Sequence, residues 1–84
     1  MNNFLFGKGF DILLCVGLNP DSCQSKIARI SGHTFSFTCN AIKQGLNQKL
    51  INRVSNDGRS YKLRLTKKGE RVRGAIMIIK EALL

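Results

Sequence analysis

The chain has 84 residues, of which 43% are hydrophobic and 7% aromatic, and its formal net charge at pH 7 is +9. A chain of this length forms one domain with a modest core, and many such domains gain stability by dimerising. The basic balance favours nucleic acid over a membrane surface, because the charge does not sit on a basic amphipathic helix. The five acids and single histidine are too few and too scattered for acid–base catalysis, so we predict that the protein is not an enzyme.

The cysteines do not form a metal or disulfide pattern. Cys15, Cys23 and Cys39 are odd in number and include no C-x-x-C pair, so we predict no zinc site, no disulfide framework and no cofactor. No signal peptide is visible, since the apolar run 12–16 is short and follows an acid. We therefore expect a cytoplasmic, intracellular protein with reduced thiols.

The first 48 residues have the pattern of a short arm followed by three helices. Residues 1–9 are the arm, and the segment 10–48 is the expected three-helix core. Its first helix, at 10–18, repeats apolar residues at the i, i+3, i+4, i+7 spacing, which predicts that it is mostly buried. Pro20 ends this helix, and Asp21 is placed to cap the backbone of the next one.

A helix-turn-helix is predicted to follow. The second helix spans about 22–30, and Gly32 suits the left-handed conformation that ends a helix. Thr34 is the expected cap of the third helix, at 35–48. In two helices joined by such a turn, the second is the one that enters a DNA major groove.

The third helix is expected to bury one stripe and present the opposite face to DNA. The predicted buried stripe is Phe35, Cys39, Ile42 and Leu46. The predicted DNA contacts are Thr34, Ser36, Phe37, Asn40, Ala41, Lys43 and Gln44. Asn and Gln bind adenine edges, Ala permits close approach, Phe contacts a thymine methyl, and hydroxyls near the helix start bind phosphate. The alternative, that these polar side chains are simply solvated, stays open.

Residues 50–65 have the pattern of a basic β-hairpin, here called the wing. Two β-like runs, 50–54 and 61–65, flank a turn that contains Gly58 and adopts positive φ angles readily. Alternation along the second run turns Tyr61, Leu63 and Leu65 inward and Lys62 and Arg64 outward. The predicted DNA contacts in and after the wing are Arg53, Asp57, Arg59, Lys62, Arg64, Lys67 and Lys68.

The C-terminal residues 70–84 are expected to form a last helix. Thr66 is a candidate cap for it, and Gly69 is expected to be a flexible joint. The apolar stripe of this helix is wider than one small domain needs, which predicts that it pairs with a second copy of the chain. The expected dimer interface consists of Val72, Ile76, Ile79 and Leu83.

One segment resembles a known family. Residues 57–69, D-G-R-S-Y-K-L-R-L-T-K-K-G, resemble the wing of MarR-like and PadR-like transcription regulators, which reads D-x-R, a strand and L-T-x-x-G. The upstream segments S-K-I-A-R-I-S-G and L-N-Q-K-L-I-N-R-V resemble the second helix and the approach to the first strand, so the resemblance covers roughly residues 20–73. The chain is much shorter than typical MarR-like proteins and similar in size to small winged-helix regulators of archaea and their viruses.

The resemblance implies an α+β, mainly α, winged helix-turn-helix with a three-helix core, a two-stranded wing and a C-terminal dimerisation helix. It also implies that Arg59 reaches into the minor groove and that Asp57 orients it, although a plain turn role for Asp57 stays open. The family usually has glycine where this chain has Lys49. The ligand pocket of longer members is not carried over, so no small-molecule ligand is predicted.

The leading prediction is that residues 1–84 form one domain of a homodimeric, sequence-specific transcription regulator that binds double-stranded DNA. The alternative is a winged-helix protein-interaction module with a basic docking surface. Cys23, near a helix N-terminus, is a lower-ranked candidate for redox sensing. His33, in the predicted turn, is interpreted as a packing or capping residue.

Overall fold

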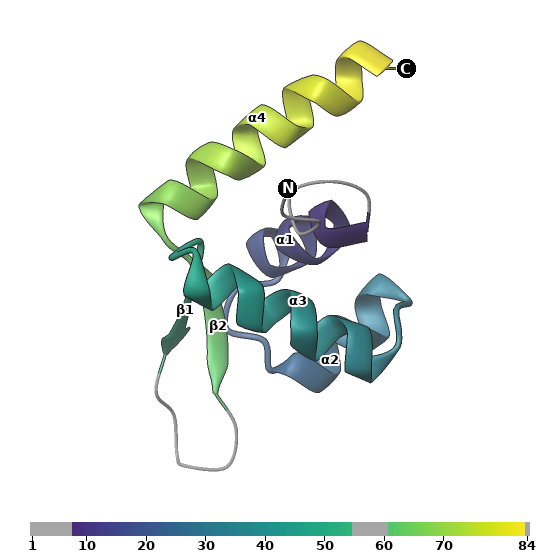
Figure 1. The fold of residues 1–84 in the computed structure, drawn as a ribbon, viewed down its shortest axis with the longest axis vertical. Helices are drawn as coiled ribbons and strands as arrows, with labels where there is room; N and C mark the ends of the chain where they lie inside the picture. The colour runs from purple at the N-terminus through teal and green to yellow at the C-terminus, as the bar shows by residue number, and fades with distance from the viewer. Residues whose placement is uncertain (1–7, 55–60, 84) are drawn as a thin grey trace.

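A computed structural model describes residues 8–54 and 61–83, and its ribbon is drawn in Figure 1. The elements are α1 (Lys8–Leu18), α2 (Gln24–Ser31), α3 (Phe35–Asn47), β1 (Ile51–Val54), β2 (Lys62–Leu65) and α4 (Lys67–Leu83). Helices α1 to α3 pack together, the hairpin extends beside α3, and α4 crosses α1 and continues away from the other helices (Figure 1). The chain therefore has the mainly helical, winged helix-turn-helix fold that the sequence predicts.

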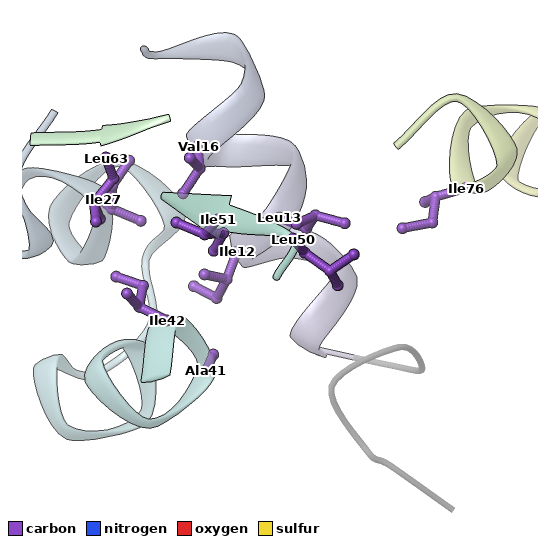
Figure 2. Close-up of a cluster of buried hydrophobic side chains, with 10 residues drawn as sticks. All are labelled: Ile12, Leu13, Val16, Ile27, Ala41, Ile42, Leu50, Ile51, Leu63 and Ile76. Atoms are coloured by element: carbon purple, nitrogen blue, oxygen red, sulfur yellow. The ribbon is translucent and has the colours of Figure 1, made fainter. Parts of the chain in front are cut away.

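All six elements contribute to one hydrophobic core, and α1 lies at its centre. This helix contacts α2, α3, α4 and β2, which explains why it is buried on several sides, as predicted. The fully or almost fully buried side chains include Ile12, Leu13, Val16, Ile27, Ile42, Leu50, Ile51, Leu63 and Ile76. In Figure 2 the Ile76 side chain points from α4 toward Leu13 and Leu50.

Local capping fixes the turn between α2 and α3. Gly32 has a φ of 78° and its N–H donates to the carbonyl of Ala28 at 3.1 Å, so the predicted left-handed end of α2 is confirmed. The hydroxyl of Thr34 accepts a hydrogen bond from the Phe37 N–H at 3.1 Å, which confirms the predicted cap of α3. These two residues set the direction in which α3 leaves the turn.

The predicted cap of α2 is wrong. Cys23, not Asp21, occupies the capping position, and its side chain makes no capping hydrogen bond. Asp21 has a φ of 65°, and its backbone N–H donates to the carbonyl of Leu63 at 3.0 Å. The loop before α2 is thereby paired with β2 instead of being folded onto the start of the helix.

The wing is an antiparallel pair of strands joined to the rest of the chain by this loop. Ile51 lies opposite Leu65 and Arg53 lies opposite Leu63. An isolated bridge connects Leu63 to Ser22, so the wing is anchored to the helical core at its base. Leu63 is fully buried, whereas Tyr61, which precedes β2, is 54% exposed. The prediction that Tyr61 faces inward is wrong, because its ring lies against the Arg53 guanidinium and not in the core cluster.

Helix α4 begins at Lys67, so the predicted joint before it does not exist. The Thr66 hydroxyl accepts from the Gly69 N–H at 2.9 Å and donates to the Lys49 carbonyl at 2.6 Å, which confirms its predicted role as a cap. Gly69 is buried inside the first turn of α4, and a Cβ there would lie 2.1 Å from the Leu50 carbonyl oxygen. Close packing of α4 against Leu50, and not flexibility, therefore requires this glycine.

The rest of α4 divides the predicted dimer residues into two groups. Ile76 is buried in the core and Val72 packs against it. Ile79 and Leu83 are exposed, together with Ile78. Ile76 and Val72 stabilise the fold of a single chain, whereas Ile79 and Leu83 belong to an apolar face that the described residues leave exposed.

Candidate nucleic-acid interface

Helix α3 turns a polar, acid-free face toward solvent. Its exposed side chains are Phe35, Ser36, Asn40, Lys43, Gln44 and Asn47. The predicted exposure of Ser36, Asn40, Lys43 and Gln44 is therefore confirmed, and their contacts with DNA stay a prediction. The exposed Thr34 lies at the start of the same helix, where free backbone N–H groups attract anions.

Two residues predicted on this face lie elsewhere. Ala41 is only 4% exposed and belongs to the core cluster, and Phe37 packs against that cluster. The ring of Phe37 also lies 5.0 Å from that of His33. The small side chain of Ala41 therefore permits close packing within the protein.

The buried stripe of α3 is rotated about the helix axis relative to the predicted one, and the burial of Thr38 explains part of the difference. The buried positions are Thr38, Ala41, Ile42 and Gly45, while Phe35 is 56% exposed. Thr38 tolerates burial because its hydroxyl donates to the carbonyl of Thr34 at 2.8 Å, which satisfies the polar group within the helix. A pattern that ranks residues by hydrophobicity misses this threonine and places Phe35 inside.

The cations of the wing lie on opposite faces of the hairpin. Directly paired residues of antiparallel strands share a face, so Arg53 lies on the same face as its partner Leu63, whose side chain is buried against the helices. Lys62 and Arg64 alternate to the other face and are exposed, as predicted. Arg53 is therefore the cation of the described strands that faces the side of the helices.

Arg53 and α3 border an open hollow, here called the helix–wing notch. Its lining residues are Lys43, Leu46, Asn47 and Arg53, and its volume is about 340 Å³. The Arg53 guanidinium carbon lies 5.0 Å from the centre of the Tyr61 ring, at a distance typical of a cation–π contact. Lys43 of α3 and Arg53 of β1 thus line the same hollow.

Arg64 has a protein partner. Its guanidinium donates two hydrogen bonds to the carboxylate of Asp21, one from Nε to Oδ1 and one from Nη2 to Oδ2 at 2.9 Å. The hydrogen bond from Arg64 is the main reason that the pKa of Asp21 lies below its ordinary value. This bidentate ion pair compensates the positive charge of Arg64 and connects the loop before α2 to the wing.

Of the other residues predicted to contact DNA in and after the wing, two lie in α4 and two lie outside the described residues. Lys67 and Lys68 lie in the first turn of α4 and are exposed. The Lys68 ammonium donates to the carbonyl of Gln48 at 3.2 Å, beside the end of α3. Asp57 and Arg59 lie outside the described residues.

The side chains of Cys23 and His33 are hydrogen-bonded to other residues of the protein. The Cys23 Sγ and the Ser25 hydroxyl oxygen are hydrogen-bonded at 3.2 Å. Hydrogen bonds with Ser25 and with the Lys26 backbone lower the pKa of the Cys23 thiol, while burial raises the pKa of Cys15. His33 Nε2 lies 3.2 Å from the Asp11 carboxylate, which supports its interpretation as a packing residue. In the described part of the chain, no three His, Cys, Asp or Glu residues are grouped to hold a metal ion.

The sequence matches no protein-family model, and no curated protein is significantly similar to it. Its structure resembles those of several solved regulators. A MarR family transcription regulator superposes with a TM-score of 0.84 and 22% identity over 89% of this chain and 51% of that chain. The transcriptional regulator SlyA superposes with a TM-score of 0.81 and 26% identity, over 90% of this chain and 54% of that chain. FabT from Streptococcus pneumoniae, solved in complex with DNA, superposes with a TM-score of 0.73 and 22% identity, over 90% of this chain and 54% of that chain.

These likenesses define the class of fold. The chain is a winged helix-turn-helix protein, and its arrangement of helices and hairpin is that of MarR-family transcription regulators. It spans about half the length of the solved proteins it matches. Among the residues that the structure describes, no helix combines the length and the apolar character needed to cross a membrane.

Proposed function

We propose that this protein is a transcription regulator that binds double-stranded DNA sequence-specifically as a homodimer, inside the cell and without enzymatic activity. The observation that carries the proposal is the exposed, acid-free face of α3 beside a basic wing. The fold supports it, because FabT, which has the same fold, was solved in complex with DNA. Recognition helices of this class enter the major groove and wings reach the minor groove.

The exposed face of α3 supplies the proposed base contacts. Asn40 and Gln44 lie one helical turn apart and are exposed, so both amides can reach neighbouring base edges, with adenine as the preferred partner. Thr34 and Ser36 lie at the start of the helix, where hydroxyls and free N–H groups bind phosphate. In this proposal the exposed Phe35, and not the partly buried Phe37, makes the apolar contact with a thymine methyl.

The basic residues outside α3 supply most of the affinity in this proposal. Arg53 and Lys62 on the strands, and Lys67 and Lys68 at the start of α4, neutralise phosphates. Arg64 takes a smaller part than the sequence predicts, because Asp21 already matches its charge. The minor-groove role of Arg59, oriented by Asp57, is kept from the family resemblance.

The exposed apolar face of α4 supports a homodimer. Ile78, Ile79 and Leu83 are exposed on one 17-residue helix, and a second copy of the same face would cover them. A two-fold dimer presents two recognition helices, so its DNA site has two-fold symmetry.

We further propose that DNA binding needs no small-molecule ligand or cofactor. One solved protein with this fold, PcaV from Streptomyces coelicolor, was crystallised in complex with its natural ligand, and this chain spans 56% of that protein. Purified protein that binds duplex DNA in plain buffer would agree with the proposal, and a requirement for an added metabolite would contradict it.

Selection of bound sequences from a random duplex pool tests the proposed function. We expect enrichment of a two-fold symmetric site with adenine- and thymine-containing half-sites that Asn40 and Gln44 read. The variant Asn40→Ala should relax the preference at one or two positions of each half-site, at about 1–3 kcal/mol per lost base contact. Failure to enrich any sequence with the wild-type protein would contradict sequence-specific binding.

A further inference from the structure

The helix–wing notch brings together two cations that lack acidic partners in the described part of the chain. Neither Lys43 nor Arg53 takes part in an ion pair among residues 8–54 and 61–83. We propose that the notch is a binding site for a single backbone phosphate, held jointly by Lys43 from α3 and Arg53 from β1. This proposal rests on the proposed DNA-binding function and names the group that the site takes.

The two cations come from elements whose relative position is fixed. Lys43 lies on a helix whose other face is packed into the core. Arg53 lies on β1, whose first residue, Ile51, is buried, as is Leu50 just before the strand. A phosphate in the notch would therefore lie between two rigid elements. Such a contact fixes the register of the DNA strand between the recognition helix and the wing.

Tyr61 positions the guanidinium of Arg53. The guanidinium carbon of Arg53 lies over the Tyr61 ring, and a contact with one ring leaves several of the five guanidinium N–H groups available for phosphate oxygens. A side chain that is already held in place loses less conformational entropy when it binds. Tyr61 is thus a positioning residue for Arg53 and need not touch the phosphate.

The shape and chemistry of the notch suit a phosphate that keeps part of its hydration. Its volume of about 340 Å³ is several times the roughly 30 Å³ that one water occupies in the liquid. The amide of Asn47 adds a hydrogen-bond donor to the two cations, and Leu46 adds an apolar wall. Among the described residues, no acid lines the hollow, whereas the charge of Arg64 is matched by Asp21.

The number of phosphates that the two cations neutralise tests the proposal. Each neutralised phosphate contributes about 0.9 to the slope of log affinity against log salt. The proposed homodimer has two notches, so a phosphate shared by Lys43 and Arg53 in each protomer accounts for about 1.8 of the slope. Lys43→Ala and Arg53→Ala should then each lower the slope by clearly less than about 1.8, and the double variant by about 1.8. Two single losses of about 1.8 that add to about 3.6 would overturn it, as would an unchanged slope in the double variant.

The matched control pairs Lys43→Ala with Lys62→Ala, because Lys62 lies on the opposite face of the wing. The slope losses of these two variants should add. Thermal unfolding should be unchanged in all variants, since the three side chains are exposed. If the wild-type protein binds duplex DNA without salt dependence, both the proposed function and the notch are overturned, whereas additive losses overturn the notch alone.

Variants of Tyr61 test the positioning role separately. Tyr61→Phe keeps the ring and should keep the affinity. Tyr61→Ala should weaken duplex binding by about 2–5-fold for each protomer that contacts the DNA, the worth of one exposed cation–π contact. In the Arg53→Ala background, Tyr61→Ala should have no further effect. The same loss in both backgrounds would show that Tyr61 acts independently of Arg53 and would overturn its assigned role.

Discussion

Lys49 shows how one backbone angle shapes the junction between α3 and the wing. Its φ of 61° lies in the left-handed region, which glycine adopts freely and which costs other residues about 1–2 kcal/mol. The family that the wing resembles usually has glycine here. Lys49 holds the conformation because its carbonyl accepts from the Thr66 hydroxyl and its N–H donates to the Leu46 carbonyl.

We predict that Lys49→Gly is more stable than Lys49→Ala by about 1 kcal/mol, because only glycine relieves the left-handed strain. Both changes remove the same charge, so the difference reports the backbone alone. Urea unfolding of the two variants measures it. A more stable alanine variant, as ordinary helix propensity requires, would contradict the observed angle.

The ion pair of Asp21 and Arg64 gives a pH-dependent contribution to stability. The pKa of Asp21 is lowered in the folded state from its ordinary value of 3.8, so the pair stabilises the fold above that pH and the contribution is lost as the pH falls through the lowered pKa. We predict that Asp21→Asn unfolds at lower temperature than the wild type at pH 7. The difference should shrink on acidification below pH 4, and a constant difference would contradict the role of the charge.

At the scale of elements, the first turn of α4 is built around close contact with the strand that precedes it. Thr66 caps the helix and bonds to Lys49, while Gly69 permits the helix to approach the Leu50 carbonyl. This contact fixes where α4 leaves the wing, and hence where its exposed apolar face lies relative to α3.

Two glycines of α4 should respond oppositely to alanine. At Gly69 the added methyl meets the Leu50 carbonyl, so Gly69→Ala should destabilise the protein by at least about 2 kcal/mol. At Gly74 no atom lies within 4 Å of the added Cβ, so Gly74→Ala should stabilise it by up to about 1 kcal/mol. Thermal unfolding of both variants measures the effect. A mild loss at Gly69 would contradict the close packing.

The helices and strands could be predicted where neighbouring residues determine them. The parts of the site that depend on residues distant in the sequence could not. Gly32 and Thr34 identify the helix-turn-helix because caps act within a few residues. The buried Thr38 was missed because its hydroxyl is satisfied inside the helix. The partner of Arg64 is Asp21, distant in the sequence, and no periodicity indicates such a pair. The pairing of Arg53 with Leu63, by contrast, follows from the register of the hairpin.

At the scale of the whole molecule, α4 extends the protein and leaves apolar surface exposed. The chain measures 41 × 26 × 23 Å, and the wing and the far end of α4 lie toward opposite ends of its long axis (Figure 1). In the proposed homodimer, a second copy would cover the face of α4 that includes Ile78, Ile79 and Leu83, and this separation would leave α3 and the wing accessible to DNA.

We predict that Ile79→Asp converts the homodimer to a monomer, because it places a charge in the proposed apolar interface. Analytical ultracentrifugation measures the mass. Leu18→Asp, at a position on α1 that is 71% exposed, is the matched control and should leave the mass unchanged. A wild-type protein that is monomeric at micromolar concentration would contradict the proposed interface.

The central claim is that α3 reads a DNA sequence while the basic wing supplies affinity. The most direct test is the ratio of two dissociation constants at one physiological salt concentration, for the selected two-fold duplex and for a random duplex of equal length. The account predicts a ratio of at least about 10³, the lower range for specific regulators. Equal affinity for the two duplexes would contradict it.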